Sequence, residues 1–348
     1  MINYLRDSIK NAVNTFVFVL LFVVALCCSV TTSYAQAFKW ETVKHNSAEY
    51  VTLRSVKEFY RFDRMKVGAK VSLENVATKI EFKSGSQNCY MNGVLFQLSS
   101  PIVKKGARYL ISRTDLLKLV DPVIRPAHII KANPFGTVVI DPGHGGRDGG
   151  AKGTVLSEKF YALQVSRLVR DKLQAKGYKV VMTRNSDVFV SRQNRVRIAN
   201  SHPNAVFVSV HFNSFSRASA SGIETFTVSP VGVPHIGRGV RRRDYNAVPG
   251  NIIDSASIAL ATAVHSRVLL FLNDVKYGND FNIIDRGIKR ARFDVLQGIK
   301  IPSILIEGGF LSNRLEARKV HTRAYQETLA NAIVRGVDIY RNSVSKKR

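Results

Sequence analysis

Three apolar, strand-like segments of this chain each end in a side chain that can bind a metal ion. The segments are residues 138–144, 206–211 and 304–307. They end in His144, His211 and Glu307, respectively. Parallel strands of one sheet would bring these ends to a single edge, where α/β proteins place their ligands. This feature therefore predicts an α/β fold with a ligand site at the carboxyl edge of its sheet.

From residue 136 onward, strand-like and helix-like segments alternate. Strands are expected at 137–140, 179–183, 205–210 and 303–306, and helices at 158–176, 191–201, 258–271 and 325–340. Such alternation predicts a mostly parallel, twisted sheet with helices on both faces. We assign residues 136–342 to this α/β domain and 343–348 to a basic tail. Segment 229–255 breaks the pattern with prolines, glycines and arginines, so we expect a long loop beside the site.

The part of the chain before this domain is rich in short strands. Residues 79–82 alternate between apolar and polar side chains, as a half-buried strand does. The Asn-Gly pair at 92–93 signals a hairpin turn. These signals predict a small α+β domain at 38–121. The stretch 122–135 contains three prolines and is expected to be the linker.

The N-terminus has the layout of a secretory signal. Basic residues precede an apolar run at 16–28, and Ala35-Gln36-Ala37 offers a small-residue cleavage site. Because the run is shorter than the roughly twenty residues that span a bilayer, cleavage is favoured over a retained anchor. We expect a signal peptide at 1–37 and an exported protein in the periplasm, the envelope or the medium. Cys89 would then be the single remaining cysteine, so no internal disulfide is expected.

The net charge of +27 indicates an anionic partner. A strongly basic surface concentrates polyanions, which include nucleic acids, anionic lipid surfaces and acidic wall polymers. An exported protein rarely meets nucleic acid, so an anionic envelope polymer or lipid surface is favoured. A solvated surface without a specific partner is the alternative. We expect a monomer.

Two imidazoles and one carboxylate are expected to hold the metal. His144 lies among glycines that leave its ring uncovered, His211 ends a valine-rich strand, and Glu158 opens a helix. Taken singly, they could be a surface histidine, a core histidine and a carboxylate facing a helix dipole. Together they form the three-ligand set of a catalytic zinc with its fourth position open to water. A phosphate-binding loop is disfavoured because Asp148 stands where G-x-G-x-x-G requires glycine.

Glu307 is the candidate general base. It directly follows an apolar strand, where burial of a carboxylate costs several kcal/mol unless the group is paired, bound to metal or protonated. Burial therefore predicts a raised pKa, which suits proton transfer near a metal-bound water.

Residues 137–340 resemble the zinc-dependent N-acetylmuramoyl-L-alanine amidases of the AmiC-like type (amidase type 3). The matching segments are 139–151, Glu158, 195–200, 209–213, 221–224, 285–291 and 307–313. The resemblance implies that His144, Glu158 and His211 bind zinc and that Glu307 is catalytic. Asn213 and Arg286 are candidates for substrate contact. Arg286 would hold a substrate carboxylate, with a purely structural role as the alternative; for Arg195 the structural role is favoured.

The resemblance also implies the reaction. It would be hydrolysis of the amide between N-acetylmuramic acid and L-alanine in peptidoglycan, for wall remodelling or daughter-cell separation. A catalytically degenerate envelope-binding protein and a zinc peptidase acting within the stem peptide are the alternatives. Several family members carry an inserted helix that plugs the zinc site, whereas segment 229–255 does not read as a helix, which puts plugging in doubt. Glu224 is expected to support the ligands, and His235 is a weaker candidate for reaching the metal.

The small N-terminal domain has a looser resemblance of its own. Segments 50–56, 90–94 and 109–112 resemble the N-terminal domain of copper amine oxidases. That resemblance implies a structural or wall-binding role without chemistry.

Overall fold

The computed structural model describes residues 38–274 and 283–345. The expected signal peptide at 1–37 and the last three residues of the expected basic tail lie outside these ranges. The chain divides into two compact units, Met1–Trp40 and Glu41–Arg348.

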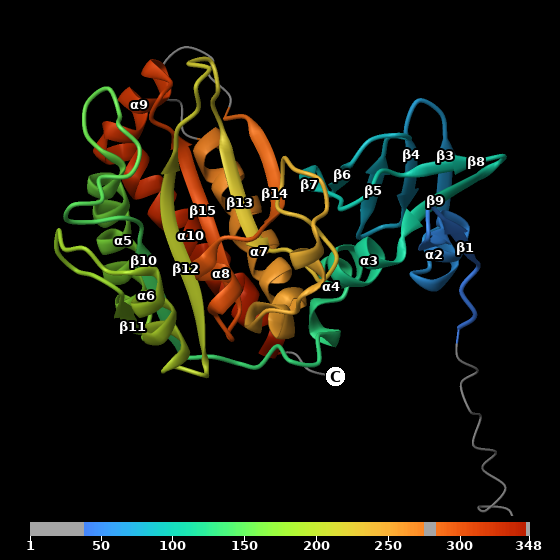
Figure 1. Ribbon diagram of the computed structural model, residues 1–348, viewed down its shortest axis with the longest axis horizontal. Coiled ribbons are helices and arrows are strands. Elements are labelled where there is room, and N and C mark those ends of the chain that lie inside the picture. The colour runs from blue at the N-terminus through green and yellow to red at the C-terminus, as the bar shows by residue number, and fades with distance from the viewer. Residues whose placement is uncertain (1–37, 275–282, 346–348) are drawn as a thin grey trace, which may run out of the picture. The chain divides into compact units, whose positions relative to one another are not determined.

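An eleven-stranded sheet runs through the described part of this unit, in the order β11-β10-β12-β15-β13-β14-β7-β6-β5-β4-β3 (Figure 1). Six of these strands lie in the C-terminal part: β10 Thr137–Pro142, β11 Lys179–Met182, β12 Ala205–Asn213, β13 Ile223–Val228, β14 Asp285–Ala291 and β15 Ser303–Phe310. Strands β11, β10, β12 and β15 are parallel neighbours, as expected from the alternating pattern.

The prediction of a mostly parallel sheet is confirmed only in part, because the sheet is mixed. Strand β13 runs antiparallel to β15 and parallel to β14. The segment between β12 and β13 is shorter than the dozen or more residues that a parallel crossover needs, so the chain reverses direction there. The remaining strands, from β7 to β3, form an antiparallel meander.

Helices cover both faces of the C-terminal part of the sheet (Figure 1). They are α5 Glu158–Ala175, α6 Arg192–Asn200, α7 Asp254–Asp274, α8 Asp294–Gly298, α9 Arg314–His321 and α10 Arg323–Ser345. Ala199 of α6 packs on Phe207 of β12, whereas Tyr161 of α5 packs on Phe212 of the same strand. Residues 207 and 212 point to opposite faces because side chains alternate along a strand. Helix α10 packs against both α5 and α7.

Helix α7 is long and apolar enough to cross a membrane by composition alone, but most of it is buried inside the protein. Gly336 of α10 lies so close to Val264 of α7 that a side chain would not fit between the two helices. Helix α7 is therefore a core helix.

In the part of the chain that the structure describes, twelve further strands and α-helices precede β10; all lie in the expected small α+β domain except α4, which runs into the expected linker. They are β1 Thr42–His45, β2 Ala48–Thr52, α2 Leu53–Phe59, β3 Arg64–Val67, β4 Val71–Glu74, β5 Lys79–Phe82, β6 Asn88–Met91, β7 Val94–Gln97, β8 Val103–Lys105, β9 Arg108–Ser112, α3 Arg113–Asp115 and α4 Asp121–Ile124. Strand β7 continues the long sheet by pairing Phe96 with Ile288 of β14. The backbone N–H of Leu95 also donates to the Asp285 carboxylate at 2.8 Å. These contacts cover the outer edge of β14, which would otherwise present unpaired backbone groups.

Candidate metal centre and catalytic cleft

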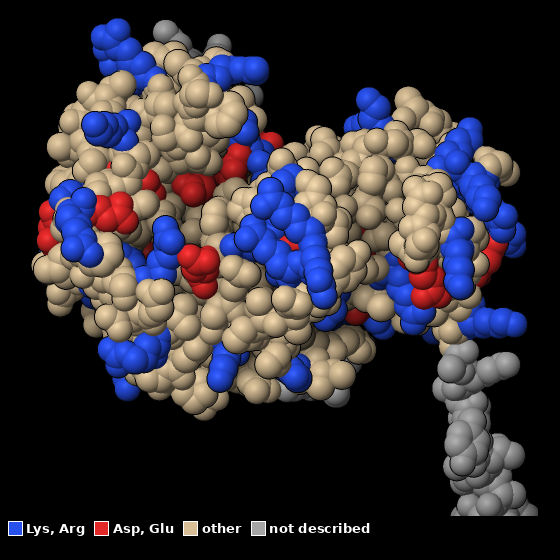
Figure 2. All heavy atoms as spheres, in the orientation of Figure 1, with Lys and Arg blue, Asp and Glu red and all other residues tan. Residues whose placement is uncertain are grey.

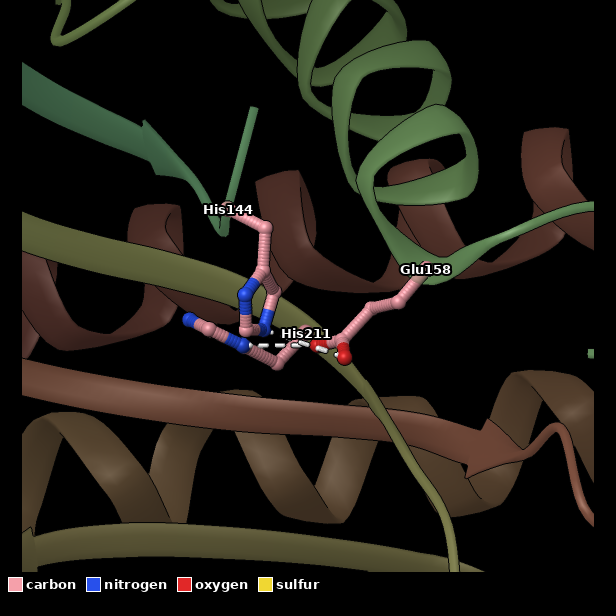
Figure 3. A group of neighbouring side chains, drawn as sticks. All are labelled: His144, Glu158 and His211. Atoms are coloured by element: carbon pink, nitrogen blue, oxygen red, sulfur yellow. Dashed lines mark hydrogen bonds and ion pairs between the residues drawn. The ribbon is translucent and has the colours of Figure 1, made fainter. Parts of the chain in front are cut away.

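Three side chains from separate elements meet at the carboxyl edge of the sheet. His144 follows β10, Glu158 opens α5, and His211 lies near the end of β12. Their ligand atoms all lie within 4.8 Å of one another, and the side chains point toward a common centre (Figure 3). Glu158 Oε2 is 3.0 Å from His144 Nε2, and Glu158 Oε1 is 2.7 Å from His211 Nδ1. The cluster expected from the sequence is therefore assembled and could hold one metal ion.

Two glycines make room for this cluster. A Cβ at Gly143 would overlap the His211 ring, and a Cβ at Gly150 would overlap both His144 and the Glu158 carboxylate. Gly150 also has a φ of +67°, which side-chain-bearing residues rarely adopt. The glycine-rich loop after β10 thus serves close packing around the ligands.

Neighbouring groups fix the orientation of the ligands. Asp148 Oδ1 lies 2.9 Å from His144 Nδ1, which leaves Nε2 directed at the cluster. The backbone N–H groups of Ala151 and Phe212 donate to the two Glu158 oxygens at 2.8 and 3.1 Å. Burial opposes ionisation of Glu158, but its hydrogen bonds with His144 and His211 outweigh burial and lower its pKa. Glu158 is thus held as a carboxylate, the form that binds metal.

Two buried arginines hold the loop that carries His144. Arg195 donates to the carbonyls of Pro142 and His144, both at 2.7 Å, and pairs with Asp141 at 2.5 Å. Arg184 donates to the Gly143 carbonyl at 2.6 Å and to the Pro142 carbonyl at 3.0 Å. In the structure Arg195 thus contacts the backbone of the ligand loop. Sequence reasoning missed Arg184, although it follows Thr183 directly at the end of a strand.

Glu307 lies in a row of polar side chains that crosses three neighbouring strands. It is the register partner of His211 on one side and of Glu224 on the other. Among the described residues, its Oε2 atom has no hydrogen-bond partner. Burial, together with the charges of Glu158 and Glu224, raises the Glu307 pKa well above its usual range. The Glu307 carboxyl thus lies next to His211 in the sheet, with one buried oxygen that no described residue engages.

The remaining sequence candidates have different surroundings. Glu224 is outside the metal cluster and pairs with Arg286 and Lys289. The Arg286 guanidinium also lies over the Phe310 ring, 4.8 Å from its centre. His235 accepts a hydrogen bond from the backbone of Arg292 at 3.0 Å, so it is engaged away from the metal cluster.

A cavity of about 720 Å³ opens over the cluster. His144, Glu158, His211 and Glu307 line this cavity together with Asn213. Phe189 and Phe293 also line it. No residue of the 229–255 loop lines this cavity. The loop nevertheless lies beside the site, as expected, because its buried Asp244 pairs with Arg238 and with the cavity-lining Arg292 at 2.6 and 3.0 Å. Figure 2 shows acidic atoms inside a hollow of this part of the molecule, with basic side chains around it.

The chain matches known proteins over its C-terminal part. The model of the N-acetylmuramoyl-L-alanine amidase family Amidase_3 matches residues 138–338. The uncharacterized protein YqiI of Bacillus subtilis is 36% identical over 204 residues, which are 59% of this chain and 84% of that protein. The N-acetylmuramoyl-L-alanine amidase AmiA of Escherichia coli K12 is 29% identical over 257 residues, 68% of this chain and 86% of AmiA. AmiC of Escherichia coli O6:H1 is 32% identical over 246 residues, and the match spans 66% of this chain and 59% of AmiC.

Solved structures are similar over the same region. The catalytic domain of the amidase CwlV from Bacillus (Paenibacillus) polymyxa var. colistinus is 29% identical, with a TM-score of 0.48, over 59% of this chain and 98% of that one. AmiC2 of Nostoc punctiforme is 33% identical, with a TM-score of 0.48. The match covers 60% of this chain and 98% of the AmiC2 chain. Because the family model matches more than half of the chain, and YqiI is similar over most of its own length, this protein belongs to the N-acetylmuramoyl-L-alanine amidase family.

Proposed function

We propose that this protein is an exported zinc hydrolase that cleaves the amide between N-acetylmuramic acid and L-alanine in peptidoglycan. The observation that carries the proposal is the placement of His144, Glu158, His211 and Glu307 around one cavity. Family membership supports the reaction type. The donor set supports zinc, because two imidazoles and one carboxylate make the protein half of a catalytic zinc site.

His144, Glu158 and His211 would hold the zinc ion. When bound there, zinc polarises the scissile carbonyl and lowers the pKa of water toward neutrality. Glu158 stays ionised in its hydrogen-bond network, and Asp148 keeps the His144 tautomer that offers Nε2. The protein thus preorganises the ligands before metal and substrate arrive.

Glu307 would transfer the protons of the reaction. Glu307 lines the cavity, and one oxygen of its carboxylate would accept a proton from the attacking water. The same oxygen would then donate that proton to the departing amine of L-alanine. Burial raises the pKa of this carboxyl, which favours retention of the proton until the second transfer.

The rest of the chain fits an envelope location. We propose export by the signal sequence at 1–37, and attraction of the basic protein to anionic envelope polymers or lipid surfaces. The small domain would have a structural or wall-binding role, as its resemblance to the copper amine oxidase N-terminal domain implies. Asn213 lines the cavity and is a candidate for substrate contact. Arg286 would reach a substrate carboxylate only by releasing Glu224.

The direct test is the product spectrum from purified sacculi, with and without a chelator. The proposal predicts that mass spectrometry finds intact stem peptides with a free L-alanine N-terminus, and that chelation abolishes their release. Fragments cut within the stem would indicate a peptidase instead. If the zinc-loaded protein binds sacculi but releases no fragment, it is a degenerate binding protein.

A further inference from the structure

Phe189 is an aromatic side chain exposed at the wall of the catalytic cavity. Its relative exposure is 44%, and the preceding Val188 is 48% exposed. Phe189 lines the same cavity as the metal cluster. Burying an aromatic ring is among the largest favourable contributions to folding and binding. A ring left open beside a catalytic centre is therefore available to a ligand.

The backbone around Phe189 is held rigidly to the loop that carries His144. Asp187 accepts the Gly146 N–H at 2.8 Å and pairs with Lys159 at 2.7 Å. Arg195 donates to the Val190 carbonyl at 3.0 Å. A Cβ added at Gly146 would press against the backbone and Cβ of Phe189. Phe189 is thus fixed close to the residues that follow His144, and its exposure does not come from a loose loop.

Arg147 completes this feature. Its guanidinium carbon lies 4.4 Å from the centre of the Phe189 ring, and the side chain is exposed. Within the described ranges, no acidic side chain forms an ion pair with Arg147. The pair therefore presents an electron-rich ring beside hydrogen-bond donors that no carboxylate engages. Such a surface suits a ligand with a C–H face and polar oxygens at its edge.

We propose that Phe189 and Arg147 form a subsite for an N-acetylated sugar ring of the glycan strand. This inference rests on the proposed function and extends it to the substrate. In that substrate only the lactyl CH and its ether oxygen separate the scissile carbonyl from the sugar ring. A carbonyl placed at the metal cluster therefore brings the ring to the adjacent cavity wall. The C–H face of the ring packs on Phe189, and Arg147 donates to its acetamide or hydroxyl oxygens.

The first test measures binding of a peptide-free disaccharide, N-acetylglucosamine linked to N-acetylmuramic acid, to the zinc-loaded protein by calorimetry. This probe lacks the scissile amide, so its binding is independent of hydrolysis. Phe189→Ala should weaken binding by about three- to tenfold, the range of an aromatic contact. Phe189→Tyr should keep it. Phe160→Ala is the matched control, since Phe160 is 40% exposed but does not line the cavity.

The second test uses hydrolysis of a soluble muropeptide. Phe189→Ala should raise KM by a similar factor and leave kcat nearly unchanged, whereas binding of the free stem peptide should not change. Equal disaccharide affinity in wild type and Phe189→Ala would overturn the subsite. The subsite would also be overturned if Phe189→Ala lost affinity for the stem peptide and kept its affinity for the disaccharide. Failure of the proposed reaction would appear separately, as absent hydrolysis by the wild type with disaccharide binding still dependent on Phe189.

Discussion

Glu307 shows how the surroundings of one residue set its chemistry. It is buried, and the negative charges of Glu158 and Glu224 act on it, so its neutral form is favoured. A neutral carboxyl cannot accept a proton. A divalent cation held by His144, Glu158 and His211 would reverse this, because an opposite charge nearby favours the ionised form. In the proposed mechanism Glu307 would therefore act as a base only in the metal-loaded protein.

Replacing Glu307 by Gln should separate metal binding from chemistry. The variant keeps the shape and the three metal-binding side chains, so its zinc content should equal that of the wild type. Its kcat should fall by about 10²- to 10⁴-fold, the usual contribution of a general base. Atomic absorption and muropeptide hydrolysis measure the two effects. Wild-type kcat in a zinc-loaded Glu307→Gln protein would remove Glu307 from the mechanism.

Asp148 should act on metal affinity. Its carboxylate fixes His144 through Nδ1, and loss of such a partner weakens metal binding by about 10- to 100-fold. Asp148→Asn should therefore raise the zinc Kd by that factor in a competition titration with a chelating dye. Asp171→Asn on the surface of α5 is the control. An unchanged Kd would show that the His144 orientation does not depend on Asp148.

At the residue scale, the sequence predicted the side chains that converge and a structural role for Arg195, but it did not predict the supporting roles of Arg184 and Asp148. His144, His211 and Glu307 were recognisable because each ends an apolar strand, and parallel strands align their ends. Arg184 and Asp148 act through contacts that depend on the folded path of the loop after β10. Spacing along the chain carries no signal for such contacts.

At the element scale, Glu316 links helix α9 to two strands. It accepts the backbone N–H groups of Phe310, at the end of β15, and Gly222, just before β13, at 2.8 and 2.9 Å. Burial raises its pKa from 4.5 to about 7, although these hydrogen bonds oppose the shift. The link therefore includes a group that changes its charge near neutral pH.

This shift predicts a stability that falls with pH. The folded protein holds the Glu316 proton more tightly than the unfolded chain does. The contribution of Glu316 to the free energy of unfolding is therefore complete below pH 4.5 and is lost as pH rises through about 7. The loss amounts to roughly 3 kcal/mol. Denaturant unfolding should give a lower free energy of unfolding at pH 8 than at pH 5 in the wild type, and a smaller difference between the two pH values in Glu316→Gln. The control is Glu327→Gln, since the pKa of Glu327 is lowered. Equal pH dependence in wild type and Glu316→Gln would contradict this role.

Four of the six described strands in the C-terminal part were predicted from the sequence, but β13 and β14 were not, and the strand directions were less predictable still. Periodicity located β10, β12, β15 and the helices between them, because buried strands and amphipathic helices leave distinct patterns. The antiparallel course of β13 depends on its neighbours β15 and β14, which hydrophobic periodicity does not encode. Helix α9 was missed because it is short and half of its eight residues are charged, so its three buried residues, Glu316, Ala317 and Val320, leave only a weak apolar pattern.

At the scale of the whole molecule, the charge of +27 should govern attachment to the wall. Exposed charges are screened over about 10 Å at 0.1 M salt and about 3 Å at 1 M. Binding of the Glu307→Gln protein to purified sacculi should therefore weaken steeply between these salt concentrations, in a sedimentation assay without hydrolysis. Binding that does not change with salt would assign attachment to the shape of the small domain instead.

The X-ray absorption spectrum at the zinc edge of the reconstituted protein tests the account most directly. The account predicts one zinc per chain, bound by two imidazole nitrogens at about 2.0–2.1 Å and by oxygen from Glu158 and water. His211→Ala should lose one imidazole from that spectrum. A spectrum with a single imidazole or a sulfur ligand in the wild type, or a protein that retains no zinc, would contradict the account.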